Sequence, residues 1–240
     1  LPAMRRNRGF SLVELLVALV ILGLLLEVVL GLTQTSSRLE KGQRALALLA
    51  EDLSLTATVL AREIYLAGYR VDNGTLLHVE SNRFILRFFC EEGMNIYCPD
   101  SMMNKVRTIT YSFNKSGTLL WGACEGATCT PSATHPVLGG VVRFGVAYRT
   151  QGVWSRQSLT VQGSNHGVGP QVEAMAVYIL AQSPLRTGSG SFTPGSTVSW
   201  ASIPDGQELR SLLNLPLSLK SEGKPMAERI VVAQTPNLIR

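Results

Sequence analysis

Two local pairs of cysteines carry the clearest side-chain chemistry of this 240-residue chain. Seven residues separate Cys90 from Cys98, and four separate Cys124 from Cys129. An even number of cysteines in local pairs is typical of disulfides in an exported domain. A zinc site with His135 as a further ligand is one alternative, but structural zinc sites usually bring their cysteines in tighter C-x-x-C pairs. Free or cross-paired thiols are the other alternative, and the spacing favours two local disulfides.

No arrangement of residues in the sequence indicates catalysis. The three histidines are far apart, and neither H-E-x-x-H nor G-x-S-x-G occurs. The stretch GSGSFTPGS lacks the lysine of a phosphate-binding loop. Residues 72–74 read D-N-G, which indicates a turn before it indicates a calcium site. We therefore expect no enzyme, no cofactor and no metal, and we expect His78, His135 and His166 in surface strands or loops.

Glu14 is a charged residue inside a long apolar segment. Residues 10–32 read FSLVELLVALVILGLLLEVVLGL, in which only Glu14 and Glu27 are charged. A helix of this length is ~34 Å long, which is enough to cross a ~30 Å hydrocarbon core. Arginines precede the segment and predict a cytoplasmic N-terminal side. Ionisable residues inside membrane spans are costly and usually have a partner and a function, so a plain signal anchor does not account for Glu14.

The pattern G-F-S-L-V-E at residues 9–14, behind three arginines, resembles the class III signal of type IV pilins and pseudopilins. In that family a membrane-embedded prepilin peptidase cuts after the glycine and methylates the new N-terminal residue. The resemblance implies a leader at residues 1–9, a cut between Gly9 and Phe10, and N-methylation of Phe10. It also implies that Glu14 pairs with the N-terminal ammonium of a neighbouring subunit during filament assembly, because a buried carboxylate is costly unless it is paired.

A second pattern follows the apolar segment and predicts that the helix continues as an amphipathic helix through residues 33–68. Apolar residues recur at spacings of four and three, which places them on one face, while charged residues such as Arg62 and Glu63 mostly lie off it. The face could be a coiled-coil seam, but its alternating alanine and leucine favour packing on a sheet. Gly68 near the end predicts the stop. The predicted face consists of Leu46, Ala50, Leu53, Ala57, Leu60, Ile64 and Ala67.

Three further stretches resemble one subgroup of the same family. The run LAREIYLAGYR at residues 60–70 is similar to the helix end of PilW-like minor pilins and J-type minor pseudopilins. VEAMAVYILAQS at residues 172–183 and RIVVAQTPNLIR at residues 229–240 are similar to the final strands of that subgroup. The resemblance implies the pilin fold, an α+β architecture in which a long N-terminal helix packs on an antiparallel β-sheet head.

Residues 69–240 predict this β-rich head, with ~7 antiparallel strands joined by short turns, including hairpins around Asn82 and Gly152. The polar, glycine-rich segment at residues 186–207 is expected to be a surface loop or insertion. Arginine and aromatic residues in RFILRFF and VRFGVAYR could contact DNA, but strands with one buried face have the same composition. The formal net charge of +5 falls to +2 without residues 1–9, because 19 basic residues then face 17 acidic ones. Nucleic-acid binding is therefore weakly supported.

The resemblance implies a minor type IV pilin that enters a pilus or helps to start it, with adhesion, twitching motility or DNA uptake as its output. A minor pseudopilin of a type II secretion system shares this architecture, and a membrane-anchored surface binding protein is the alternative of another class. Minor subunits at the extreme tip often lack the glutamate that this chain keeps as Glu14.

The implied partners are prepilin peptidase, other major and minor pilin subunits, and the inner-membrane assembly platform. Before assembly the chain is expected to cross the inner membrane once with its head in the periplasm. After assembly it is expected in a cell-surface pilus.

Overall fold

The computed structural model describes residues 12–71, 74–94, 98–126, 129, 132–163, 171–184, 191–215, 218–220 and 224–238. The predicted processing residues Gly9 and Phe10 lie outside these ranges, and so does His166. The chain divides into two compact units, Leu1–Arg44 and Ala45–Arg240, which are described separately.

Helix α1, Leu12–Leu66, is continuous over 55 residues and supplies all the described structure of the first unit. The sequence before Arg44 is rich in leucine and valine and contains no helix-interrupting proline after residue 11. An 18-residue window of α1 has a mean hydropathy of 2.9, and none of it is buried. The helix is thus long and apolar enough to cross a membrane, and its bare apolar surface requires lipid or another apolar surface around it.

The part of α1 that belongs to the second unit buries one face, but this face differs from the predicted one. Leu53, Leu60, Ile64 and Ala67 are buried as predicted, whereas Leu46 is 41% exposed. The predicted positions average 3.5 residues per turn, and a straight α-helix has 3.6, so the two faces drift apart along the helix. The buried positions at the start of the face are instead Ala45 and Leu49, followed by Thr56 and Glu63.

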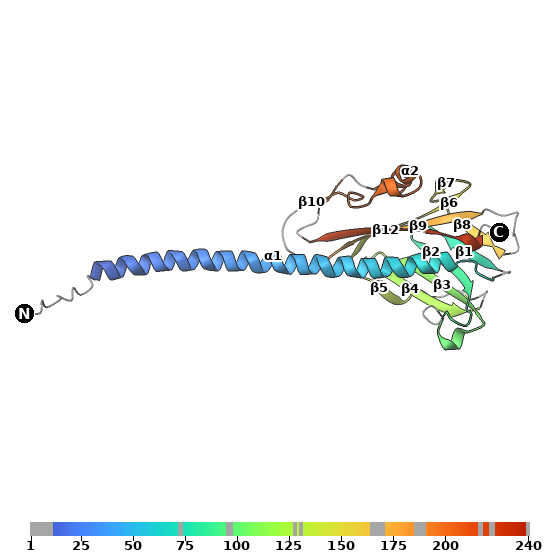
Figure 1. Ribbon diagram of the computed structural model, residues 1–240, viewed down its shortest axis with the longest axis horizontal. Coiled ribbons are helices and arrows are strands. Elements are labelled where there is room, and N and C mark those ends of the chain that lie inside the picture. Colours follow the sequence, from blue (N-terminus) through green and yellow to red (C-terminus); the bar gives the residue numbers. More distant parts are fainter. Residues whose placement is uncertain are drawn as a thin grey trace, which may run out of the picture. The chain divides into compact units, whose positions relative to one another are not determined.

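The head contains two main antiparallel sheets, where the sequence predicted one (Figure 1). The six-stranded sheet has the order β5-β4-β3-β2-β1-β8, and the four-stranded sheet has the order β12-β9-β6-β7. The predicted hairpins around Asn82 and Gly152 are present as β1–β2 and β6–β7. The six-stranded sheet is built from β1 (Thr75–Val79), β2 (Arg83–Phe89), β3 (Val106–Phe113), β4 (Leu119–Glu125), β5 (His135–Leu138) and β8 (Leu159–Gln162). The four-stranded sheet is built from β6 (Val141–Thr150), β7 (Val153–Ser155), β9 (Val172–Gln182) and β12 (Met226–Gln234).

Strand β9 separates two hydrophobic cores. Met175, Val177 and Ile179 join the larger core with α1 and the six-stranded sheet. The alternate side chains of β9, including Tyr178 and Leu180, join a second core. Because both faces of β9 are covered, its sequence is an almost continuous apolar run rather than an alternating one.

The second core is covered by the segment that the sequence assigns to a surface loop. Trp200 is buried there, and its indole Nε1 donates to Gly195 O at 2.7 Å. Figure 1 shows α2 on the side of the four-stranded sheet away from α1. Composition suggested an exposed loop because glycine and serine dominate it, but its few apolar residues are the ones that pack. The elements that contribute residues to this core are η3 (Trp200–Ser202), α2 (Gly206–Leu212) and β11 (Leu219–Lys220). Strand β10 (Ser191–Phe192) pairs with β11. The short helices η1 (Asp100–Met102) and η4 (Pro236–Leu238) complete the head.

Candidate functional site

Glu14 lies in the first turn of α1, and its side chain is exposed among exposed leucine and valine side chains. It is therefore a carboxylate on a surface that is otherwise suited to lipid or to other apolar helices. More than three turns without a charged or polar side chain, residues 15–26, follow before Glu27. The structure thus places an ionisable group in the first turn of an apolar helix.

The four cysteines form two local disulfides, Cys90–Cys98 and Cys124–Cys129. Each bridge closes a loop that follows a strand of the six-stranded sheet, after β2 and at the end of β4. Within the described ranges, no group of histidine, cysteine and acidic side chains is arranged to hold a metal ion. The bridges therefore act on the stability of the loops.

Cys129 of the second disulfide and Ser132 just after it lie against strands β2 and β4 of the six-stranded sheet. Arg87 is buried, and its guanidinium donates to Thr108 Oγ1 at 2.9 Å and to Cys129 O at 3.2 Å. A Cβ atom at Gly122 would collide with Ser132 O, so only glycine allows the loop to approach the strand this closely. Arg87 belongs to the RFILRFF stretch considered for DNA contact, and here it supports the chain's own loop.

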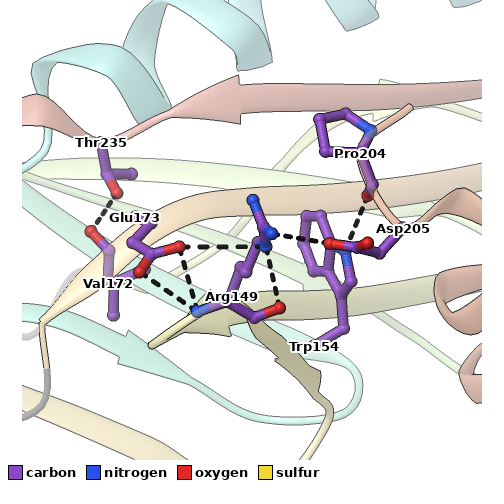
Figure 2. Close-up of polar contacts among 8 residues, drawn as sticks. Arg149, Trp154, Val172, Glu173, Pro204, Asp205 and Thr235 are labelled. Atoms are coloured by element: carbon purple, nitrogen blue, oxygen red, sulfur yellow. Dashed lines mark hydrogen bonds and ion pairs between the residues drawn. The ribbon is translucent and has the colours of Figure 1, made fainter. Parts of the chain in front are cut away.

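An ion-pair network ties the β6–β7 hairpin to the segment before α2 (Figure 2). Arg149 donates through its guanidinium to Asp205 Oδ2 at 2.6 Å and to Gly152 O at 3.2 Å. Glu173 on β9 accepts from the Gly152 backbone N–H at 3.2 Å. Trp154 Nε1 donates to Pro204 O at 3.1 Å. These contacts satisfy the charged and polar groups locally, which gives Arg149 a structural role in the head.

Two further arginines close the C-terminal end of α2. Arg143 donates to Leu213 O at 3.3 Å and to Asn214 O at 2.5 Å, and Arg156 donates to Leu212 O at 3.2 Å. The last carbonyls of a helix have no partner within the helix, and cations are favoured at this end. Arg143 lies in the VRFGVAYR stretch, so this stretch also stabilises the fold.

Two tyrosine–glutamate pairs are buried in the head, and sequence reasoning missed both. Tyr111 on β3 donates to Glu63 on α1 at 2.6 Å, and Tyr178 on β9 donates to Glu228 on β12 at 2.5 Å. Burial raises the pKa of Glu63 to about 7. The hydrogen bond from Tyr111 and the positive charge of Arg107 act in the opposite direction, but their effect is smaller. A signal for Glu63 was available, because it lies three residues after Leu60 and four before Ala67 on the buried face.

The chain is similar to known proteins over most of its length. Residues 48–238 match the family described as Type IV pilin Tt1219. The chain belongs to this family of type IV pilins. Residues 4–26 of the pilin match the prokaryotic N-terminal methylation motif. The pilin is also similar to a solved structure, the type IV-like pilin TTHA1219 from Thermus thermophilus. The two are 44% identical with a TM-score of 0.70, over 79% of this chain and 98% of that chain. No curated protein matches.

The family resemblance and the α+β pilin fold predicted from the sequence are confirmed by these matches and by the two sheets around α1. The methylation motif covers Gly9, Phe10 and Glu14, whose individual roles stay predictions. Two of the pilin's three histidines, His78 and His135, lie on described strands. His78 on β1 contacts Thr160 Oγ1 at 2.7 Å, and His135 on β5 packs beside an aromatic ring.

Proposed function

We propose that this pilin is a minor subunit of a type IV pilus, cut between Gly9 and Phe10, methylated at Phe10 and positioned in the filament through Glu14. The match of residues 4–26 to the methylation motif is the observation that carries the proposal. The resemblance of residues 60–70 to PilW-like minor pilins favours a minor subunit over the major one.

The exposed apolar surface of α1 supports both stages of this life cycle. Side chains from Leu12 to Leu32 are exposed, so the helix is stable in a bilayer first and among other apolar helices afterwards. Removal of the leader would leave an ammonium group at Phe10. A carboxylate in an apolar filament interior is stabilised by such a cation, which would place the Phe10 terminus of one subunit against Glu14 of another.

The partners follow from this sequence of steps. Prepilin peptidase would process the leader, the inner-membrane assembly platform would extract the subunit, and other pilins would surround α1. The head would lie in the periplasm before assembly and on the pilus afterwards, where adhesion, twitching motility or DNA uptake would use it.

Mass spectrometry of sheared pili tests processing and placement together. The expected result is a peptide that begins with N-methylated Phe10, at low abundance relative to the major subunit. A membrane-bound chain that keeps residues 5–9 would contradict cleavage and would favour an anchored surface binding protein. If the chain were found only with a secretion apparatus and never in sheared pili, a pseudopilin would be favoured instead. Residues 60–70 are also similar to the helix end of J-type minor pseudopilins.

The role of Glu14 is tested by replacing it with alanine and by replacing Glu27 in the same way as the matched control. Both variants keep the apolar helix, so both are expected in the membrane fraction at normal amounts. Glu14→Ala should enter sheared pili at least ~10-fold less than the natural chain, because the paired charge is lost. Glu27→Ala should enter normally. Equal incorporation of the two variants would contradict the proposed pairing.

A further inference from the structure

A cavity of about 500 Å³ lies within the head between α1 and strands β3, β4 and β5. Its size falls within the range of small-molecule sites, ~300–1,000 Å³. Leu55 and Val59 of α1 and Val137 of β5 give it an apolar wall, while Arg107, Tyr111 and Glu63 bring polar groups to it. Such a mixture of apolar surface with a few convergent polar groups is typical of ligand sites.

Arg107 is a buried cation at this cavity with an unsatisfied hydrogen-bond donor. Its side chain is 8% exposed, and its Nε has no hydrogen-bond partner among the described residues. The guanidinium lies over the ring of Trp121 at 5.6 Å from the ring centroid, which fixes its plane. Burial lowers the pKa of Arg107, which reflects the cost of holding this cation away from water. A buried cation of this kind is stabilised by an anion that its remaining donors can reach.

Two of the carboxyl groups near Arg107, those of Glu63 and Glu125, are engaged by other side chains. Glu63 accepts the Tyr111 hydroxyl, and the salt bridges described in the head do not include Arg107. Glu125 lies opposite Arg107 in the sheet register, but it pairs with Lys105 at 2.8 Å. The other charged or titratable groups that face the cavity or its walls are Asp52 and Arg62 on α1, Tyr111 on β3 and His135 on β5.

We propose that this cavity binds a small organic carboxylate, whose anionic group meets the guanidinium of Arg107 and whose apolar body lies against Leu55, Val59 and Val137. A guanidinium presents parallel N–H donors that match the two oxygens of a carboxylate, and this match is better than for a point charge such as lysine. The aliphatic wall, whose residues are 41–61% exposed, selects an acid with an apolar body. The site belongs to the second unit, whereas Glu14 belongs to the first, and it does not depend on the filament role proposed above.

Glu63 gives the site a dependence on pH. Below about pH 7 its carboxyl is mostly neutral, so the charge of Arg107 is available to the ligand. Above this pH Glu63 is ionised, attracts Arg107 and repels a second carboxylate in the same cavity. Binding should therefore weaken as the pH rises from 6 to 8, while the acid itself stays ionised throughout.

Calorimetric titration of the full chain in nanodiscs with sodium benzoate tests the proposal, with benzamide as the neutral molecule of the same shape. We expect saturable binding of one benzoate per chain, about tenfold tighter at pH 6 than at pH 8, and no saturable binding of benzamide. Equal binding of the two molecules, or no saturation by benzoate at millimolar concentration, would overturn the proposal.

Three substitutions localise the site. Arg107→Leu should weaken benzoate binding at least ~10-fold, and Arg107→Lys should weaken it less because the charge remains. Glu63→Gln should keep the affinity and remove its pH dependence. Arg229→Leu, an exposed arginine on β12, is the matched control and should bind as the natural chain does. Circular dichroism establishes that each variant is folded, and unchanged binding in folded Arg107→Leu would place the benzoate elsewhere and overturn the assignment.

Discussion

The two buried tyrosine–glutamate pairs of the head are alike in residue type and differ in their surroundings. Glu228 accepts four hydrogen bonds, from the Tyr178 hydroxyl, from the Gly195 backbone N–H and from both the backbone N–H and the hydroxyl of Thr197. Glu63 accepts the Tyr111 hydroxyl and lies beside a cavity. Bonds to a carboxylate favour its charged form, and burial without them favours the neutral form.

Because of this difference, the two glutamates have different roles in the head. Glu228 ties the segment around Gly195 to strand β12, so it acts as a structural clamp on the second core. Glu63 has a pKa raised to about 7 by burial, so its charge changes near neutral pH. Both tyrosines have a raised pKa, first because of burial and then because of the neighbouring glutamate, and both therefore remain neutral donors.

The halves of the head that hold these pairs are also reinforced differently. Both disulfides lie in the six-stranded half, which is the half that contains Tyr111. In the four-stranded half, the reinforcement includes the Glu228 bonds, the Arg149 network (Figure 2), and the bonds from Arg143 and Arg156 to the end of α2. We therefore expect each half of the head to lose stability when its own reinforcement is removed.

Removing the Glu228 carboxylate should have the largest effect. Glu228→Ala leaves the Gly195 and Thr197 backbone donors and the Tyr178 hydroxyl buried without their acceptor, so we expect a loss of ~3–5 kcal/mol in the free energy of unfolding. Urea unfolding of the full chain in detergent measures it. Glu228→Gln keeps one acceptor oxygen and should lose less. A loss under ~1 kcal/mol for the alanine variant would remove the distinction between the two pairs.

Glu63 should make stability depend on pH in the opposite direction to an ordinary carboxylate. Its pKa is about 7 in the folded chain and 4.5 in the reference state, so between these values the folded chain holds a proton that the unfolded chain has lost. Stability should therefore be highest below pH 4.5 as far as Glu63 is concerned, and should fall by ~3 kcal/mol as the pH rises through 7. Unfolding measured between pH 5 and 8 should show this slope.

Glu63→Gln is the control for this slope, because glutamine still accepts the Tyr111 hydroxyl and does not titrate. The variant should lose the part of the pH dependence that lies between 4.5 and 7. Identical slopes for the variant and the natural chain would assign the effect to another group.

The disulfides should contribute an intermediate amount, confined to the six-stranded half. Replacing Cys90 and Cys98 by serine opens a loop with a sequence separation of 8 and should cost ~2–3 kcal/mol by the loop-entropy argument. The Cys124–Cys129 bridge, with a separation of 5, should cost slightly less. Hydrogen exchange of the amides should show the loss around β2 and β4. Equal loss of protection in β9 and β12 would mean that the halves unfold as one.

The Arg149–Asp205 ion pair should contribute least, because the two side chains are 25% and 47% exposed. Asp205→Ala is expected to cost at most ~1 kcal/mol at low salt, and this difference should nearly vanish in 1 M NaCl, where charges are screened within ~3 Å. The melting temperature at both salt concentrations measures it. A cost above ~2 kcal/mol that salt does not change would show that packing at Trp154, rather than charge, holds this segment.

Features that depend on neighbouring residues in the chain were predictable from the sequence. The G-F-S-L-V-E pattern and the apolar run after it led to the pilin family, which the match over residues 48–238 shows. The hairpins around Asn82 and Gly152 were predictable because turn residues lie between alternating strands. The drift of the α1 face was not predicted, because an integer spacing of three and four hides the 3.6-residue period.

The sequence by itself thus determined the family, the long helix and the β-rich head, because local pattern and composition record each of them. Only the tertiary structure decided which glutamates are buried, since Glu63 and Glu228 look like other surface glutamates until α1 meets β3 and β12 meets β9. It also decided that residues 198–215 cover a second core, and that Arg107 faces a cavity. These outcomes depend on contacts between distant segments, which no local pattern encodes.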